Sequence, residues 1–580
     1  MQKKQTILVV ASLLVVVLSV TLAYFTAQII GKGKDVSVSS ADLKIIFTDS
    51  DGNIEGNGIT PGWSNSKTFT VKNESNGTYK YDIIIKDLVN TFKTYKYLQY
   101  KITSTDGGYN MTDYSYLPKS STKEDVALAY EVSIDKGKTH TYTIEIKYVN
   151  DEYVDQSIDM GQSLSGTIYI REFTKPTMKL TDKLMADNPT IGTRTDFNTT
   201  FTETNTGTLY KATEQIGTNP VKDVYYFAGD AKNNWVKFGK TKESSCTYKG
   251  KEVLILNESV LKNVETETEC TSTNICNAGE NGGYAVGLTE SECNENGATW
   301  ITEKATWNGI TTKDIYWRII RTNANGSIKL LYAGTSPDTD KAYIGMSAFN
   351  TTDNDPMYVG YKYGTSGSLE NNRLNTNDST IKTYVDNWYK NNLNDYTKYL
   401  SNDAVYCNDR NLASGNTYST TKGFGYVPYE RIVGNPELNT NPQPTYNCTN
   451  MSDAFSVNNT SAKLDYPVGL MTIDELSYAG GQGLRILTAP YAWYYTNANG
   501  ESITGSAYSW SLSPYGWVGS DLLFWFWYGS RDPGFLYFGG VGISFAVRPS
   551  VSLSSCNLIS RGDGSPEKPY VVYTGSGVCE

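Results

Sequence analysis

Apolar and polar residues alternate with a period of two in short runs between residues 41 and 172. Side chains of one parity lie on one face of a strand, so a strand with one buried face shows this alternation. In the run 139–149 the apolar parity is Tyr142, Ile144, Ile146 and Tyr148. Four similar runs are 66–73, 79–88, 126–134 and 165–172. The pattern predicts an all-β sandwich in this part of the chain.

After residue 190 the pattern is mixed and predicts an α+β region. Expected strands are 223–229, 234–239, 252–259, 314–323 and 327–335. The last two flank Asn325-Gly326, a dipeptide that favours a tight hairpin turn. Apolar residues at helical spacing predict helices at 379–393 and 469–481. The helix-terminal signals are Asp378 or Ser379 as the first N-cap, Thr472 with Glu475 as a capping box, and Gly480 as a stop.

The domain boundary is expected at residues 173–189, where Pro176 ends a strand and a short amphipathic helix follows. The sequence therefore predicts a multidomain chain. Its parts are a leader (1–30), a sandwich (31–175), a linker with a short helix (176–190), and an α+β domain (191–580) with a cysteine-containing insertion at about 241–300.

The N-terminus has the pattern of an export signal. Lys3 and Lys4 precede an almost uncharged stretch, Thr6–Phe25. This stretch is long enough to anchor the chain in a membrane, and Thr21-Leu22-Ala23 would also suit a signal peptidase. Both alternatives predict an extracellular or cell-surface protein that meets the membrane only through residues 6–25.

Charge and histidine content exclude several classes of function. The net charge is -10 and no basic patch is evident, so nucleic acid is not an expected partner. The only histidine is His140, which excludes most zinc hydrolase sites and most histidine-based catalytic dyads. The acidic segment 49–58 lacks the glycine and glutamate of a calcium-binding loop and is interpreted as a hairpin turn. We expect no metal and no cofactor.

The eight cysteines all follow residue 245, and an even number in an exported chain favours disulfides. The simplest pairing has two local bonds within 246–293, then Cys407–Cys448 and Cys556–Cys579, although spacing alone leaves the connectivity open. The disulfide candidates are Cys246, Cys270, Cys276, Cys293, Cys407, Cys448, Cys556 and Cys579.

The leader ending LAYFTAQ, followed by SADLKI and ITPGWSNSKTFTVKNESNGTYKYDIII, resembles the biofilm matrix fibre proteins and the camelysin group of Gram-positive bacteria. The resemblance covers about residues 1–175 and implies a jelly-roll-like sandwich. Camelysin is described as a metallopeptidase, but this chain has no His-Glu-x-x-His motif. We therefore carry over the fold and not the activity.

The motifs IYWRIIRTN, LMTIDEL and VRPSVSL occur in this order and resemble an exported bacterial domain of unassigned function. More distantly, residues 220–575 resemble the C-type-lectin-like domain of the formylglycine-generating enzyme superfamily. Those enzymes use a cysteine pair near the last strands, and no cysteine lies between Cys448 and Cys556. The resemblance implies a C-type-lectin-like fold without that catalysis. We therefore expect that this chain is not an enzyme.

Residues 520–540 (SDLLFWFWYGSRDPGFLYFGG) contain eight aromatic residues among 21 and are apolar on both parities. A strand buried on both faces would show the same pattern. In C-type-lectin-like domains this interval carries the ligand-binding face, and in receptors diversified by retroelements it is hypervariable. The resemblance implies a ligand-binding face within 516–546, formed by Trp517, Asp521, Leu523, Trp525, Trp527, Tyr528, Arg531, Asp532, Phe535, Tyr537, Phe538, Ser544 and Phe545.

Together these patterns predict an adhesin or receptor that recognises a protein or glycan at a cell or phage surface. The first alternative is a structural subunit of an extracellular fibre that self-associates through the N-terminal sandwich. A carbohydrate-active enzyme is a weaker alternative, because no pair of carboxylates is singled out.

Overall fold

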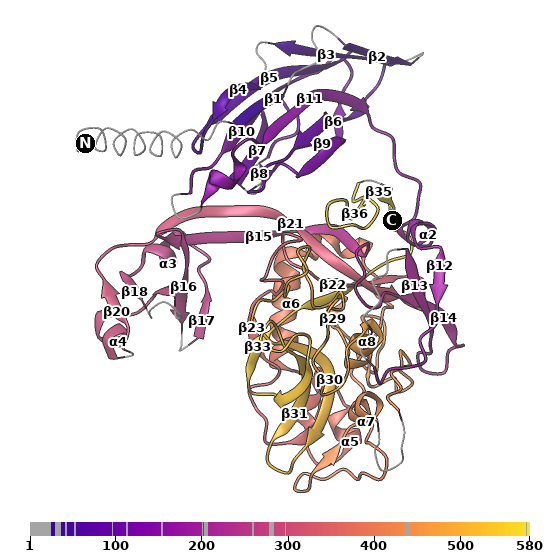
Figure 1. Cartoon of the computed structure of the whole chain (residues 1–580). Helices are drawn as coiled ribbons and strands as arrows, with labels where there is room; N and C mark the ends of the chain where they lie inside the picture. The colour runs from indigo at the N-terminus through magenta and orange to yellow at the C-terminus, as the bar shows by residue number, and fades with distance from the viewer. Residues whose placement is uncertain are drawn as a thin grey trace, which may run out of the picture. The chain divides into compact units, whose positions relative to one another are not determined.

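The structure is a computed structural model, and Figure 1 shows its strands and helices. It describes residues 25–29, 36–40, 43–50, 54–94, 97–111, 114–151, 155–199, 201, 207–257, 260–277, 283–295, 297–434, 441–575 and 577–579. Side chains are described from residue 59 onward, except those of 256–263 and 311. The described chain is mostly β and divides into two compact units, 1–175 with 242–312 and 176–241 with 313–580.

The N-terminal region is a β-sandwich of two sheets. Their strand orders are β4-β1-β11-β6-β9 and β2-β3-β5-β10-β7-β8. The strands are β1 (Phe25–Ile29), β2 (Val36–Ser40), β3 (Leu43–Ser50), β4 (Ile54–Ile59), β5 (Ser64–Asn73), β6 (Tyr79–Asn90), β7 (Leu98–Ser104), β8 (Ser115–Tyr116), β9 (Ser120–Ile134), β10 (Thr139–Tyr148) and β11 (Ser163–Glu172).

Alternation along β10 builds the core of this sandwich. Tyr142, Ile144, Ile146 and Tyr148 are each 0% exposed, while the residues between them reach the surface at least in part. β10 pairs antiparallel with β5 and β7, and the apolar faces of both sheets form one core. The predicted all-β sandwich is therefore confirmed.

Two details of this region differ from the sequence-based expectation. Residues Phe25–Ile29 form strand β1 between β4 and β11, so the sandwich begins before the expected boundary at residue 31. The expected leader otherwise falls on residues outside the described ones. β3 and β4 belong to different sheets, so the segment 49–58 connects two sheets and does not close a hairpin. Its side chains lie outside the described ones.

His140 lies near the start of β10 and is only 6% exposed. Its Nδ1 is 2.9 Å from the hydroxyl of Tyr81, which also hydrogen bonds with the hydroxyl of Tyr142. Burial lowers the pKa of His140, although the charges of Asp106 and Asp135 oppose the shift. The imidazole is therefore part of a hydrogen-bonded cluster of core side chains.

Residues 242–312 form a small module held by two disulfides, Cys246–Cys270 and Cys276–Cys293. All four cysteines are almost fully buried, and Cys246 and Cys270 belong to the small core of the module. Its elements are β16 (Lys251–Asn257), β17 (Val260–Asn263), α3 (Glu267–Thr271), β18 (Ile275–Asn277), β19 (Tyr284–Val286), α4 (Glu290–Glu295) and β20 (Thr299–Ile301).

The C-terminal unit contains two larger sheets and several short helices. The first sheet has 15 strands, of which β16–β20 belong to the module 242–312 described above, and β15 and β21 extend into that module. Its other strands are β12 (Thr190–Gly192), β13 (Thr208–Glu214), β14 (Lys222–Tyr226), β15 (Trp235–Tyr248), β21 (Thr306–Thr322), β22 (Ile328–Tyr332), β29 (Val468–Leu470), β34 (Pro549–Leu553), β35 (Ile559–Arg561) and β36 (Tyr570–Val572). Strands of the second are β23 (Met346–Ala348), β27 (Phe424–Gly425), β30 (Ser509–Trp517), β31 (Leu522–Trp527), β32 (Leu536–Gly540) and β33 (Ser544–Ala546). The remaining strands form two short pairs, β24 (Lys362–Tyr363) with β25 (Asn377–Asp378) and β26 (Tyr406–Cys407) with β28 (Ala454–Phe455).

The cap signals of the two predicted helices are observed, although the second helix is shorter than the expected 469–481 because residues 469–470 belong to β29. The α-helices are α2 (Leu180–Asp187), α5 (Leu369–Asn372), α6 (Thr380–Asn392), α7 (Val427–Val433) and α8 (Ile473–Ala479). Ser379, one of the two expected N-caps, accepts a hydrogen bond from the backbone N–H of Lys382. Thr472 and Glu475 form the predicted capping box of α8, and Gly480 ends it with a positive φ of 123°. The short helix expected in the linker is α2.

Disulfides Cys407–Cys448 and Cys556–Cys579 complete a set of four, and the expected simplest pairing is confirmed. Four structural disulfides indicate folding in an oxidising, extracellular environment. Among the helices of the described residues, none has the length and apolar character to cross a membrane.

The three sequence motifs of the C-terminal unit meet in its first sheet. β22 pairs with β21 on one side and β34 on the other, and β29 pairs with β34. Arg318 of β21 is 2% exposed and donates to the carbonyls of Ala231 and Thr496. Arg548, just before β34, is 0% exposed and donates to the carbonyls of Tyr332 and Tyr494. Each of these arginines therefore connects two backbone segments that are far apart in the sequence by hydrogen bonds to their carbonyl groups.

A buried charge network joins α8 to the same sheet. Oε1 of Glu475 accepts from Arg321 Nε at 3.0 Å and from Lys329 Nζ at 2.7 Å, and Arg321 also bonds Glu214 at 2.8 Å. All four side chains are at most 4% exposed. Burial alone would raise the pKa of Glu475, but the charges of Lys329 and Arg321 outweigh it and hold that pKa below its usual range.

We expect Glu475→Gln to destabilise the C-terminal unit by about 3–5 kcal/mol, because it leaves two buried cations with one carboxylate. Guanidinium unfolding followed by tryptophan fluorescence measures the effect, since eight of the 11 tryptophans lie in the C-terminal unit. Glu501→Gln, at an exposed position, is the matched control and should change the free energy of unfolding by less than about 0.5 kcal/mol. If Glu475→Gln changed the free energy of unfolding as little as Glu501→Gln does, the buried charge network would contribute no stability.

Candidate functional site

The aromatic stretch identified in the sequence lies in the second sheet of the C-terminal unit. Residues Leu522–Trp527 form β31 and Leu536–Gly540 form β32, in the order β23-β33-β30-β31-β32. The two strands pair antiparallel, with Trp525 opposite Phe538 and Trp527 opposite Leu536. The sequence motif SAYSWSLSPY supplies most of β30, on the other side of β31.

β31 is covered on both faces, which explains why it is apolar on both parities. On one face Phe524 stacks on Phe349 with ring centroids 3.9 Å apart. On the other face Trp525 packs edge-on against Tyr515 at 5.1 Å. The strand is thus an inner layer between two sets of side chains.

Four of the residues assigned to the expected ligand-binding face are therefore buried. Trp525 is 0% exposed, Trp527 1%, Trp517 2% and Phe545 8%. A ligand cannot reach these rings in this arrangement, so the expectation that they lie on the binding face is corrected. They are buried because other side chains pack on both faces of β31, a tertiary arrangement that the periodicity of the sequence does not predict.

The other expected residues reach the surface. Asp521, Arg531 and Ser544 are exposed, and Leu523, Tyr528, Asp532, Phe535, Tyr537 and Phe538 are half-buried. Sequence reasoning missed the half-buried Tyr508 and Tyr515, which belong to the neighbouring SAYSWSLSPY motif. We call the half-exposed rings together the aromatic surface: Tyr508, Tyr515, Tyr528, Phe535, Tyr537 and Phe538.

Four rings of the aromatic surface form a row in which each is nearly parallel to the next. Phe535 lies 5.2 Å from Tyr537 with an interplanar angle of 22°, and Tyr537 lies 4.6 Å from Phe538 at 17°. Phe538 in turn stacks on Tyr515 at 3.9 Å and 27°. The closest stack in the row is that of Phe538 on Tyr515, and the other two pairs are nearly parallel at larger centroid distances.

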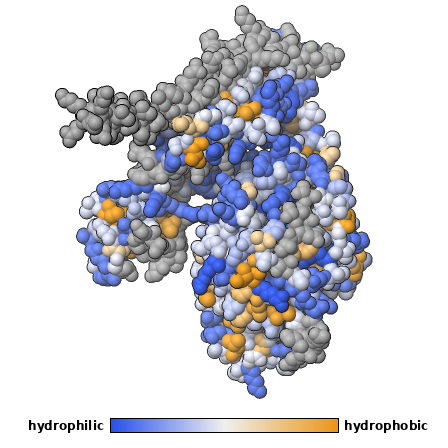
Figure 2. All heavy atoms as spheres, in the orientation of Figure 1, coloured by the Kyte–Doolittle hydropathy of each residue, from blue (hydrophilic) through white to orange (hydrophobic). Residues whose placement is uncertain are grey.

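Exposed aliphatic residues lie in the same sheet. Ile543 is 49% exposed and Met346, at the start of β23, is 44% exposed. Figure 2 shows hydrophobic residues gathered on the C-terminal unit, in the area where Figure 1 labels β23, β33 and β31. Clustered apolar groups on a protein surface are typical of a contact region.

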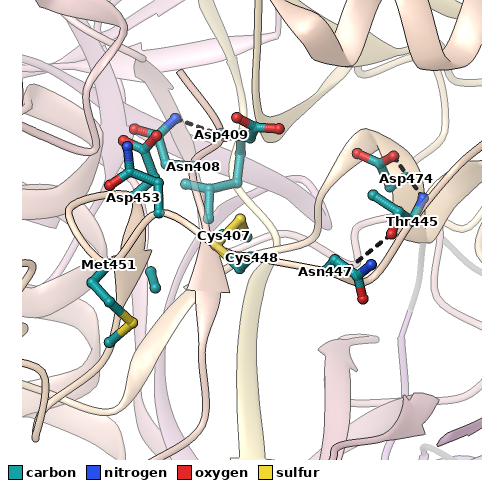
Figure 3. The surroundings of a disulfide bond; sticks show 12 residues. Cys407, Asn408, Asp409, Thr445, Asn447, Cys448, Met451, Asp453 and Asp474 are labelled. Atoms are coloured by element: carbon teal, nitrogen blue, oxygen red, sulfur yellow. Dashed lines mark hydrogen bonds between the residues drawn. A yellow bond between two sulfur atoms is a disulfide. The ribbon is translucent and has the colours of Figure 1, made fainter. Parts of the chain in front are cut away.

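A second candidate is a polar cleft of about 230 Å³ beside the disulfide Cys407–Cys448. Figure 3 shows this disulfide between Asp409 and Asp453 on one side and Thr445, Asn447 and Asp474 on the other. The cleft is lined by Cys407, Asp409, Asn411, Val427, Arg431, Thr445, Asn447, Cys448, Thr449, Asn450 and Asp453.

The charged groups of this cleft pair with one another. Arg431 donates to Asp409 at 2.7 Å and, through two nitrogens, to both carboxylate oxygens of Asp474. Asp453 accepts from Arg410 and Arg373. Each of these carboxylates already has a cationic partner, so we interpret the cleft as a structural ion-pair network.

A cluster of three carboxylates, Asp378, Asp386 and Asp465, could by distance hold a metal ion. Nζ of Lys382, however, bonds to all three, at 3.2, 2.5 and 2.9 Å. The ammonium group therefore takes the central position that a cation would need. Burial raises the pKa of Asp386 to about 6, against the opposing charge of Lys382.

No protein-family model matches this chain, and no curated protein sequence matches it. Because the cleft and the carboxylate cluster are both occupied by internal ion pairs, the aromatic surface is, among the described residues, the better candidate for a binding site.

We expect Trp525→Ala and Trp527→Ala each to destabilise the C-terminal unit by about 3–5 kcal/mol, because each removes a fully buried ring. Tyr537→Ala, at a half-exposed ring, should cost less than about 1 kcal/mol and is the matched control. Chemical unfolding followed by circular dichroism measures the three effects. Wild-type stability in the two tryptophan variants would contradict their assignment to the core.

Proposed function

We propose that this chain is a surface-displayed ligand-binding protein, an adhesin or receptor, whose contact region is the aromatic surface. The supporting observation is that six half-exposed aromatic rings on and beside β30, β31 and β32 contact one another in one continuous series. Large aromatic side chains supply much contact area at a small entropic cost and dominate many protein interfaces. The four disulfides fit a protein that functions outside the cell.

We further propose that the C-terminal unit is C-type-lectin-like and that the N-terminal sandwich is of the jelly-roll-like matrix-fibre type. Support comes from the place of the aromatic stretch, between the SLSPY segment and the VRPSVSL strand, as in lectin-like domains. In this proposal the rigid sheet positions the binding residues, and the sandwich displays the unit outside the cell.

Tyr528→Ala and Tyr537→Ala should each weaken ligand binding about 30-fold, as expected for a ring that contributes about 2 kcal/mol. The assay is binding of the fluorescently labelled full-length chain to intact bacterial cells and to protein and glycan arrays. Tyr363→Ala is the matched control, because Tyr363 is a half-buried tyrosine of β24, outside the aromatic surface. Unchanged binding in the first two variants would argue against the aromatic surface as the contact region.

If retroelements diversify this interval, variation between gene copies should follow exposure. Substitutions should concentrate at accessible positions such as Asp521, Tyr528 and Arg531, while Trp525 and Trp527 stay constant because they are buried. Sequencing of the gene across the source population, with its flanking DNA, measures this. Copies with an invariant interval and no nearby reverse transcriptase gene would instead support one fixed ligand.

A further inference from the structure

Strand β32 is the last strand of its sheet and pairs with β31 only along one edge. At the two ends of this pairing, Tyr528 N–H donates to the carbonyl of Phe535 and Val541 N–H donates to the carbonyl of Leu522. In an antiparallel ladder, alternate residues exchange hydrogen bonds with the neighbouring strand. The backbone groups of Leu536, Phe538 and Gly540 therefore point away from β31.

Part of this outer edge is already used within the chain. The carbonyl of Leu536 accepts from Leu484 N–H at 2.9 Å, and the carbonyl of Gly540 accepts from Ile543 N–H at 3.1 Å. No group of the described residues bonds to the outward N–H or C=O of Phe538 or to the N–H of Gly540. The open part of the edge is thus Phe538–Gly540.

The strand is short and the segment at Gly483 bridges Leu536, but the open part of the edge, residues 538–540, carries no residue that opposes strand pairing. Proteins commonly guard edge strands with lysine, proline or a bulge, whereas β32 reads Leu-Tyr-Phe-Gly-Gly and pairs with β31 in unbroken register. Of its two glycines, Gly540 leaves space beside the backbone, whereas a Cβ atom at Gly539 would lie 3.0 Å from the ring of Phe526. A Cβ atom added at Gly540 would meet only the side chain of Ile543, at 4.0 Å.

The aromatic row contributes residues to this edge, since Tyr537 and Phe538 belong to β32 and Phe535 directly precedes it. The side chains of an added strand would pack beside these rings, whose edges carry the positive end of the aromatic quadrupole and interact well with carbonyl groups.

We propose that an extended segment of a partner polypeptide adds to β32 as a further strand, hydrogen bonding to the outward groups of Phe538 and Gly540. In strand addition, backbone hydrogen bonds supply affinity and neighbouring side chains supply specificity, which here is the role of the aromatic row. The inference rests on the proposed function and narrows its ligand from protein or glycan to polypeptide.

The test uses the full-length chain and a displayed library of random linear dodecapeptides, from which one binding peptide is selected and synthesised. Gly540→Pro removes the outward N–H, which serves no bond to β31, and should weaken peptide binding about tenfold or more. Gly540→Ala keeps this N–H and should bind within about threefold of wild type. The melting temperatures of both variants check that the unit remains folded.

A scan of the peptide itself is independent of any change in the protein. N-methylation of single peptide residues should abolish binding at one position, that of the residue whose N–H donates to the free carbonyl of Phe538, and should be tolerated at its two neighbours, whose N–H groups face away from β32. Uniform tolerance of N-methylation, or equal affinity of Gly540→Pro and Gly540→Ala, would overturn strand addition.

Glycan binding separates this inference from the proposed function. If a glycan array gives binding that Tyr537→Ala abolishes and Gly540→Pro leaves intact, the strand-addition inference is wrong and the proposed function stands. Absence of binding to peptides, proteins, glycans and cells would overturn the proposed function, and this inference with it.

Discussion

The buried pairing of Glu475 with Arg321 and Lys329 is the constraint on which the rest of the C-terminal unit depends. Two cations and two carboxylates, counting Glu214, share an interior that excludes almost all water. Such groups are costly to bury unless each has its partner, so a different placement of α8 against β21 and β22 would leave a charge unpaired. The other oxygen of Glu475 accepts from the N–H of Thr472 and so fixes the start of α8 at the same point. These bonds fix α8 in one position relative to β21 and β22 of the first sheet.

The second sheet combines a rigid interior with an accessible rim. β31 is packed on both faces by aromatic side chains, which leaves it no freedom to slide or turn. Adjacent strands bring further rings to the surface, where they keep one side against the core and the other toward solvent. Half-buried rings of this kind lose little conformational entropy when a partner covers them, because their positions are already restricted. In the proposed function the same packing would serve both stability and recognition.

Local signals in the sequence predict much of this fold. The alternation in β10, the capping box of Thr472 and Glu475, and the Ser379 N-cap each depend on residues close together in the chain, and all are observed. Sequence reasoning assigned Glu475 only to a capping box, since its partners Arg321 and Lys329 are 154 and 146 residues away. It likewise could not separate the buried Trp525 from the half-exposed Tyr537. Both are aromatic strand residues, and only the tertiary cover over β31 distinguishes them.

The disulfide-braced module 242–312 enters and leaves the C-terminal unit through β15 and β21, which are neighbours in the first sheet. The two points where the chain departs and returns therefore lie on adjacent strands, as in an ordinary β-hairpin. The module has its own core and its own covalent bonds. Such an insertion can be acquired, lost or exchanged in evolution as one genetic event, because the strands that receive it would need only a short turn in its place.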